Sequence, residues 1–117
     1  MCYLLPAYTR EGVLKMDANT KTKIESLLTG NRVVLFMKGT PSFPQCGFSA
    51  RAVAILQELG VKFQGVDVLA DEEIRQGIKE FGNWPTIPQL YINKELVGGS
   101  DIMMEMYQSG ELQEMVK

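Results

Sequence analysis

Histidine is absent from this chain of 117 residues, and cysteine occurs only twice, as Cys2 and Cys46. The lack of histidine excludes Ser-His and Cys-His catalytic pairs, and it excludes an imidazole ligand for a metal ion. Two cysteines do not make a disulfide framework for a domain of this size, so we expect a reducing compartment. Sulfur chemistry in the middle of the chain therefore depends on Cys46 alone.

Long apolar runs and an excess of positive charge are also absent. No apolar run approaches the roughly 18–20 residues that span a bilayer, so we expect no membrane-spanning helix. Lysine and arginine number 12 against 14 acidic residues, which gives a formal net charge of −2. That balance argues against broad binding to the phosphate backbone of nucleic acids. We therefore expect one domain whose partners include neither a membrane nor a nucleic acid.

The beginning of the chain differs from the rest. Residues 1–15 lack a basic segment ahead of a long apolar stretch, so a secretory signal is not expected. We interpret residues 1–17 as an N-terminal extension and residues 18–117 as the domain. Residues 1–15 fit an upstream extension, a processed leader or a cloning remnant. We expect a cytoplasmic protein, or one of the mitochondrial matrix or plastid stroma if residues 1–15 belong to a leader.

The hydrophobic pattern predicts alternating helices and strands. Helices are predicted at 21–30, 47–59, 72–82, 102–110 and 111–117, and strands at 32–38, 61–68, 89–92 and 95–99. Side chains that favour helix N-termini precede three of these helices: Asn19 with Thr20, Asp71, and Ser100 with Asp101. A β-α-β crossover followed by an antiparallel hairpin indicates an α/β domain with a four-stranded mixed sheet flanked by helices.

Cys46 lies where a proline-rich loop leads into the helix predicted at 47–59. The free N–H groups and the dipole of a helix start favour an anion, so the pKa of the thiol should fall below about 8.5. Lys38, at the end of the preceding strand, adds a positive charge nearby. A buried structural cysteine is the alternative, but Gly47 and the proline-rich loop favour a reactive thiol.

Two further segments indicate a binding site for an extended peptide. At 84–88, a proline that enters a strand directly often follows a cis bond, which leaves the backbone of Ile87 free to pair with a peptide. At 98–101, glycines lead into a helix start whose N–H groups can hold a carboxylate. The alternatives are a rigid turn and an ordinary helix cap. Arg75 and Lys79 share one helix face, where most such pairs are solvated surface charge.

In order along the chain, these segments resemble the monothiol branch of the glutaredoxin family, which has the thioredoxin-like fold. The branch is marked by Cys-Gly-Phe-Ser, here Cys46 to Ser49. The accompanying segments are Lys38 to Pro41, Trp84 to Gln89 and Gly98 to Asp101. The resemblance covers residues 18–117 and implies that the protein binds glutathione.

The resemblance also assigns roles to individual residues. Cys46 would be the reactive thiol and the metal ligand. Lys38 and Arg75 would contact the glycine carboxylate of glutathione, Pro88 would be the cis-proline, and the Ile87 backbone would pair with the glutathione cysteine. The glutathione-binding residues that it implies are Lys38, Phe48, Arg75, Ile87, Pro88, Gly99, Ser100 and Asp101, the last three at the γ-glutamyl end.

Ser49 stands where dithiol relatives carry a second cysteine, and a hydroxyl cannot resolve a mixed disulfide, so the dithiol mechanism is excluded. Two functions remain open. A [2Fe-2S] cluster takes four ligands, typically thiolates. Two chains would each supply Cys46, and two glutathione molecules would supply the rest. The resemblance therefore favours an iron-sulfur cluster carrier. The alternative is a glutathione-dependent thiol-disulfide oxidoreductase that removes glutathione from proteins through Cys46, with at most weak activity.

The resemblance implies partners as well: a second copy of the chain when the cluster is bound, BolA-like proteins, and apo iron-sulfur proteins as recipients. Many relatives carry cysteine where this chain has Ser100, so a candidate resolving thiol is missing. Cys2 is the only substitute, and an internal Cys2–Cys46 disulfide is not favoured.

Overall fold

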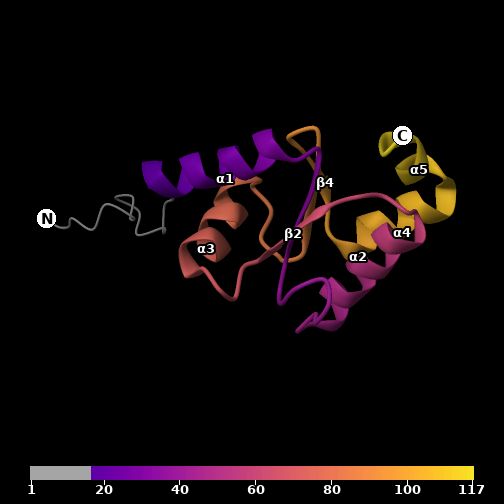
Figure 1. Ribbon diagram of the computed structural model, residues 1–117, viewed down its shortest axis with the longest axis horizontal. Coiled ribbons are helices and arrows are strands. Elements are labelled where there is room, and N and C mark those ends of the chain that lie inside the picture. Colours follow the sequence, from indigo (N-terminus) through magenta and orange to yellow (C-terminus); the bar gives the residue numbers. More distant parts are fainter. Residues whose placement is uncertain (1–16) are drawn as a thin grey trace, which may run out of the picture.

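The computed structural model describes residues 17–117 (Figure 1). The expectations for residues 1–16, including a disulfide between Cys2 and Cys46, lie outside the described residues. The helices are α1 (Ala18–Gly30), α2 (Gly47–Glu58), α3 (Glu72–Phe81), α4 (Ser100–Ser109) and α5 (Glu111–Met115). The strands are β1 (Val33–Met37), β2 (Gln64–Asp67), β3 (Gln89–Ile92) and β4 (Glu95–Gly98).

The four strands form one mixed sheet in the order β2-β1-β3-β4. Strand β1 pairs with β2 in parallel and with β3 antiparallel, and β3 pairs antiparallel with β4. The parallel strands β1 and β2 are connected through α2, as a crossover requires. The antiparallel strands β3 and β4 are joined by the predicted hairpin at Asn93 and Lys94. The predicted four-stranded mixed sheet flanked by helices is confirmed.

Helices cover both faces of the sheet. All five residues of β1 are buried, and because successive strand side chains point to opposite faces, this strand contributes to two cores. On one face Val33, Leu35 and Met37 pack with α2, α4 and α5. On the other, Val34 and Phe36 pack with α1 and α3. The central strand is therefore a continuous apolar run, as its sequence indicates.

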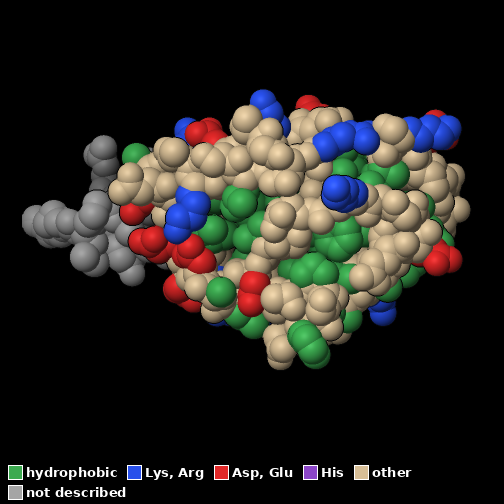
Figure 2. Space-filling model, in the orientation of Figure 1, with side chains coloured by type: hydrophobic (Ala, Val, Ile, Leu, Met, Phe, Trp, Pro, Cys, Tyr) green, Lys and Arg blue, Asp and Glu red, His purple; other side chains and the backbone are tan. Residues whose placement is uncertain are grey.

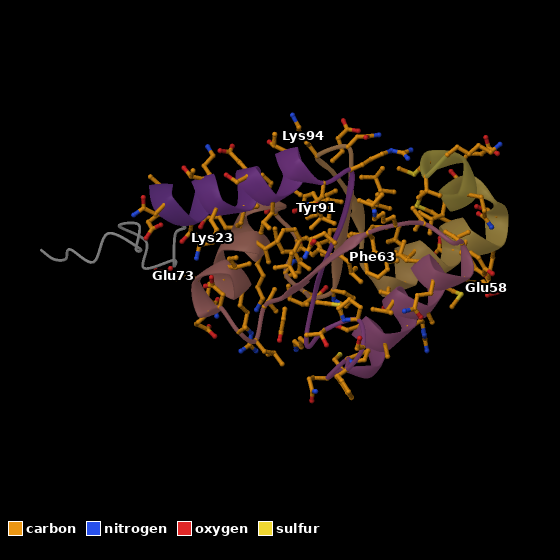
Figure 3. The ribbon with its side chains drawn as sticks, viewed as in Figure 1. Lys23, Glu58, Phe63, Glu73, Tyr91 and Lys94 are labelled. Carbon is orange, nitrogen blue, oxygen red and sulfur yellow. The ribbon has the colours of Figure 1, made fainter. Side chains whose placement is uncertain are left out.

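An ion pair also links the two helices of the second face. Lys23 Nζ on α1 lies 2.7 Å from Asp71 Oδ2, at the start of α3. Figure 3 shows Lys23 beside α3 and Tyr91 in the interior, and Tyr91 is only 2% exposed. Figure 2 shows charged side chains of both signs scattered over the face of the molecule that is in view. No helix within residues 17–117 is long and apolar enough to cross a bilayer.

Two predicted helix caps were wrong by one to three positions. Asp17 caps α1, because its side chain accepts a hydrogen bond from the N–H of Thr20 at 2.7 Å. Thr20 itself lies inside the helix and is buried, so its hydroxyl does not serve as the cap. Gly99, rather than Ser100 or Asp101, is the N-cap of α4. The cap at Asp71 is confirmed, since its carboxylate accepts from the N–H groups of Glu73 and Ile74.

Strand β2 is shorter than predicted. The alternation over 61–68 predicts eight residues, but only Gln64–Asp67 pair with β1. Val61 and Phe63 instead pack against the core on the α2 side of the sheet. An alternating apolar pattern indicates that one side of a segment is buried. Here the burial begins before the residues that pair with β1.

The strand pairing also brings the functional segments together. Strand β1 ends where β3 begins, with Phe36 opposite Gln89, and the end of β4 lies beside Leu90. Consequently the loop after β1, the start of α2, the loop before β3 and the start of α4 all meet at one end of the sheet.

Candidate functional site

Cys46 is the N-cap residue of α2. Its backbone is extended, with φ −151° and ψ 139°, and its thiol is free and partly exposed. The backbone N–H of Ser49 lowers the pKa of this thiol most. The N–H of Phe48, the charge of Lys38 and the Ser49 hydroxyl lower the pKa further, while partial burial opposes them. The thiolate is therefore stabilised by the first turn of a helix, as the sequence predicts.

The loop between β1 and α2 folds back on itself and places Lys38 beside this helix start. The N–H of Lys38 donates to Ser49 Oγ at 3.0 Å, and Lys38 O accepts from the N–H of Gln45 at 2.8 Å. Gly39 has φ +92°, and a Cβ there would lie 2.5 Å from the Phe43 carbonyl oxygen. The N–H of Gly39 donates to Asp67 Oδ1 at 2.9 Å, which ties the loop to the end of β2.

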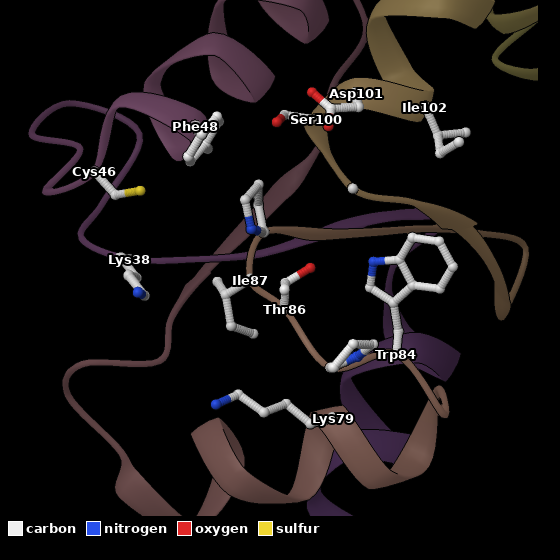
Figure 4. Close-up of a pocket in the computed structure, with 13 residues that line it drawn as sticks. Lys38, Cys46, Phe48, Lys79, Trp84, Thr86, Ile87, Ser100, Asp101 and Ile102 are labelled. Carbon is white, nitrogen blue, oxygen red and sulfur yellow. The ribbon is translucent and has the colours of Figure 1, made fainter.

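A cavity of about 550 Å³ opens beside the thiol (Figure 4). Four segments provide its wall: the ends of the β1–α2 connection, helix α3, the loop before β3, and the start of α4. The lining residues are Lys38, Cys46, Phe48, Lys79, Trp84, Pro85, Thr86, Ile87, Pro88, Gly99, Ser100, Asp101 and Ile102.

All but one of the site residues predicted from the sequence line the cavity. Lys38, Cys46 and Phe48 line it on one side, and Ile87 and Pro88 lie on the strand side, joined by a cis peptide bond as the sequence predicts. Gly99, Ser100 and Asp101 line the part of the cavity at the start of α4.

Arg75 is not among the lining residues. Its Nη1 lies 3.6 Å from Glu72 Oε1 on the same helix, and its Nε is buried without a hydrogen-bond partner. Its predicted contact with a ligand carboxylate stays a prediction. Lys79, one turn further along α3, does line the cavity. The i, i+4 spacing of Arg75 and Lys79 indicated that both lie on one face of the helix, although such pairs are more often solvated surface charge.

Charge is distributed unevenly around the cavity. Lys38 and Lys79 approach it from the sides of β1 and α3 (Figure 4). Neither lysine forms an ion pair within residues 17–117. Asp101 and the N-terminus of α4 lie across the cavity, and that helix start has no side-chain cap. Its first N–H groups are thus available to an anion.

The glycine at this helix start permits a close approach. A Cβ on Gly99 would lie 3.3 Å from the Pro88 carbonyl oxygen and 3.5 Å from Trp84 Nε1. The first distance is tight, so the neighbouring backbone would have to give by a few tenths of an ångström to admit a side chain. The start of α4 and the loop before β3 therefore pack closely at Gly99.

The described residues offer few ligands to a metal. No group of three or more Cys, Asp or Glu side chains in residues 17–117 could hold a metal ion. A metal group at this site would take one thiolate from the chain and its other ligands from elsewhere.

Comparisons with known proteins agree with this geometry. A family model described as Glutaredoxin matches residues 33–97. A Synechocystis protein named uncharacterized monothiol glutaredoxin ycf64-like is 63% identical over 102 residues, covering 87% of this chain and 95% of that protein. Monothiol glutaredoxin-5, mitochondrial, from Lachancea kluyveri is 54% identical over 105 residues, covering 87% of this chain and 73% of that protein.

A solved structure is similar as well. The solution structure of reduced poplar apo GrxS14 superposes with a TM-score of 0.73 at 55% identity. The superposition covers 80% of this chain and 86% of the poplar chain. The likeness therefore extends over most of the chain.

Proposed function

Because the chain belongs to the monothiol branch of the glutaredoxin family and has its thioredoxin-like fold, we propose that it binds glutathione beside Cys46 and carries a [2Fe-2S] cluster between two subunits. One observation supports this most: a single thiol with a lowered pKa opens onto a cavity that has cations on one side and an uncapped helix start on the other. The rest of the proposal follows from matching that cavity to a ligand.

Glutathione carries a carboxylate at each end and an ammonium group at its γ-glutamyl end. Lys38 and Lys79 suit the glycine carboxylate. Arg75, on the same helix as Lys79, does not line the cavity, and its contact with that carboxylate stays a prediction. The N-terminus of α4 suits the γ-glutamyl carboxylate, and Asp101 suits the ammonium group. With its two ends held in this way, the tripeptide would have its thiol in the middle part of the cavity, on the side of Cys46.

The middle of the tripeptide is extended peptide and requires backbone partners. No hydrogen bond within residues 17–117 engages the N–H or C=O of Ile87. These groups suit strand-like pairing with the cysteine residue of glutathione. Phe48, which is 55% exposed, and Pro88 supply apolar surface around that contact.

The cluster is cargo in this proposal. Each chain offers one suitable thiolate, because residues 17–117 contain only Cys46 as a cysteine, whereas a [2Fe-2S] cluster generally takes four ligands. Two Cys46 thiolates from two chains and two glutathione thiolates complete the set. Half of the ligands are then not covalently part of the protein, which suits release to apo iron-sulfur proteins. BolA-like proteins are a further proposed partner.

A second function is supported by the lowered thiol pKa and partial exposure of Cys46. The thiolate would attack the glutathione sulfur of a glutathionylated protein, forming a Cys46–glutathione disulfide and releasing the protein thiolate. A second glutathione thiolate would then attack that glutathione sulfur, releasing Cys46 and forming glutathione disulfide. Ser49 cannot take the place of the second glutathione, because a hydroxyl is not a competent nucleophile here.

Either function requires a reduced thiol, so we propose a reducing compartment. The cytoplasm is one, and the mitochondrial matrix and plastid stroma are others. The Lachancea kluyveri relative is named as mitochondrial, which supports the inclusion of organelles.

Anaerobic reconstitution separates the two functions. The protein is incubated with iron, sulfide and glutathione, then examined by visible absorption and gel filtration. A brown dimer that bleaches to monomer when glutathione is withdrawn supports the carrier. A colourless monomer with rapid turnover in a glutathione-coupled disulfide assay contradicts the carrier and supports the oxidoreductase. The Cys46→Ser variant is the control, and it should fold normally but neither bind a cluster nor exchange glutathione.

A further inference from the structure

A buried amide lies directly beneath the loop that forms one wall of the cavity. Gln89, the first residue of β3, has an exposed fraction of 0%. Its Nε2 donates to the carbonyl oxygens of Trp84 at 2.9 Å and Thr86 at 3.2 Å. Its Oε1 accepts from the Tyr91 hydroxyl at 3.0 Å. Both amide hydrogens and the amide oxygen are therefore in use.

Tyr91 fixes the orientation of this amide. Its ring packs edge-on against Phe36, with centroids 5.6 Å apart, and lies tilted against Phe81, with centroids 6.1 Å apart. Burial raises the pKa of Tyr91 to about 12, so its hydroxyl keeps its proton and donates at neutral pH. A hydroxyl donor on one side of the amide places the oxygen there and leaves the NH2 group to face the loop.

The main chain passes very close to this pair of side chains. A Cβ at Gly82 would lie 2.3 Å from the Tyr91 hydroxyl and 3.0 Å from Gln89 Oε1. Two residues later, the N–H of Trp84 donates to Lys79 O at 2.9 Å. The loop is thus fastened to the end of α3 at one end and to Gln89 along its middle.

The bond to Thr86 has a geometric consequence for Ile87. The Thr86 carbonyl and the Ile87 N–H belong to one peptide unit, and the only cis bond in residues 17–117 is the next one, Ile87–Pro88. In a planar trans peptide the C=O and N–H point in opposite directions. Because Gln89 holds the Thr86 oxygen toward the interior, the Ile87 N–H faces away from the interior, on the side where the cavity lies.

We propose that Gln89, oriented by Tyr91, is a positioning residue for glutathione binding: its amide holds the loop at 84–86 so that the Ile87 backbone is presented to the tripeptide. This inference rests on the proposed function and adds residues that do not themselves line the cavity. In this proposal Gln89 sets the direction of a ligand-binding group in addition to holding the loop.

The test compares Gln89→Met with the unmodified full-length chain. Methionine keeps most of the side-chain volume but donates no hydrogen bond. Glutathione affinity is measured by calorimetry, and the pH profile of Cys46 alkylation is measured in parallel. We expect glutathione to bind about tenfold more weakly, the effect of losing well-aligned hydrogen bonds. The alkylation profile should not move, because Gln89 is not among the groups that shift the pKa of Cys46.

Trp84 supplies a second readout. It is the only tryptophan in the chain, so fluorescence emission reports the position of this loop. Gln89→Met should shift the emission to the red as the indole becomes more exposed. Ile24→Val is the matched control, since Ile24 lies in the same core cluster as Tyr91 but belongs to α1. It should weaken folding without changing the emission or glutathione binding.

Tyr91→Phe covers the case in which Gln89→Met does not fold. It removes only the hydroxyl and should weaken glutathione binding about threefold, because Gln89 Oε1 then loses its donor and the amide is held less firmly. If folded variants bind within experimental error of the unmodified chain, Gln89 has no positioning role, although the proposed function stands. If the unmodified chain itself binds no glutathione, the proposed function fails and this inference fails with it.

Discussion

The backbone N–H of Lys38 donates a hydrogen bond to the hydroxyl of Ser49, with 3.0 Å between the two atoms. Ser49 has an exposed fraction of 0% and lies in the first turn of α2. The bond therefore joins the end of β1 to the helix start that stabilises the Cys46 thiolate. The residue that cannot act as a second nucleophile still organises the first one.

Ser49→Ala should remove that acceptor and leave the Lys38 N–H without a partner. Leaving a buried donor unsatisfied costs about 1–3 kcal/mol, so the free energy of unfolding should fall by that order in a urea titration. The pKa of Cys46 should rise, because the Ser49 hydroxyl contributes to lowering it. Ser42→Ala, in the exposed part of the same loop, should change neither quantity. An unchanged urea midpoint for Ser49→Ala would mean that the hydrogen bond between Lys38 and Ser49 does not stabilise the fold.

The reactivity of Cys46 should depend on pH in a characteristic way. Its pKa is lower in the folded chain than in an ordinary thiol, so alkylation in a Cys2→Ser background should reach half its maximal rate below the midpoint of a free thiol. The same shift links ionisation to folding. The contribution to stability is complete above the unfolded thiol pKa and is lost as the pH falls through the folded pKa. Cys46→Ser should abolish this dependence in pH-resolved denaturation.

Lys38 and Lys79 should be separable although both line the cavity. Lys38 is among the groups that contribute most to the pKa shift of Cys46, and Lys79 is not. Lys38→Ala should raise the thiol pKa and weaken glutathione binding. Lys79→Ala should weaken glutathione binding, by about two- to tenfold for one charged contact, with the thiol pKa unmoved. Calorimetry and the alkylation profile measure the two quantities. If the pKa of Cys46 is the same in both variants, Lys38 has no larger effect on the thiol than Lys79 has.

Gly82→Ala should destabilise the fold, whereas Gly30→Ala should not. A Cβ at Gly82 would meet the Tyr91 hydroxyl at 2.3 Å, and a Cβ at Gly30 would have nothing within 4 Å. Forcing an extra carbon into a packed interior costs about 1–3 kcal/mol. Thermal unfolding compares the two variants, and Trp84 emission shows whether the loop moves in Gly82→Ala. Equal melting temperatures would mean that Tyr91 moves aside without cost.

Much of this site can be predicted from the sequence because its chemistry depends on local patterns. A cysteine before a helical run, a proline entering a strand and an aspartate before a helix each fix a local conformation, and Cys46, Pro88 and Asp71 are found as predicted. Helix starts were less predictable where several capping residues are adjacent. Asp17, Asn19 and Thr20 are all residue types that cap helices, and the structure shows Asp17 as the cap, with its side chain accepting from the N–H of Thr20. The local sequence alone does not distinguish between such neighbours.

The position of Lys79 on the cavity wall, and the hydrogen bonds of Gln89 and Tyr91 beneath the loop at 84–86, could not be predicted for a similar reason. Helical periodicity places Arg75 and Lys79 on one face of α3 but does not say how that face meets the cavity. Gln89 reads as an ordinary polar residue at the start of a strand. Its two carbonyl partners lie three and five residues away in a non-repetitive loop, where no period applies.

The cavity takes its walls from segments that run from Lys38 to Ile102, so no short stretch of the chain contains it. A ligand held there binds only the completed fold and shifts the balance between folded and unfolded chains by mass action. Abundant glutathione would then protect the protein from proteases that act on opened molecules, and depletion of the tripeptide would shorten its lifetime. The concentration of a small reductant would thus set how many copies of the protein persist.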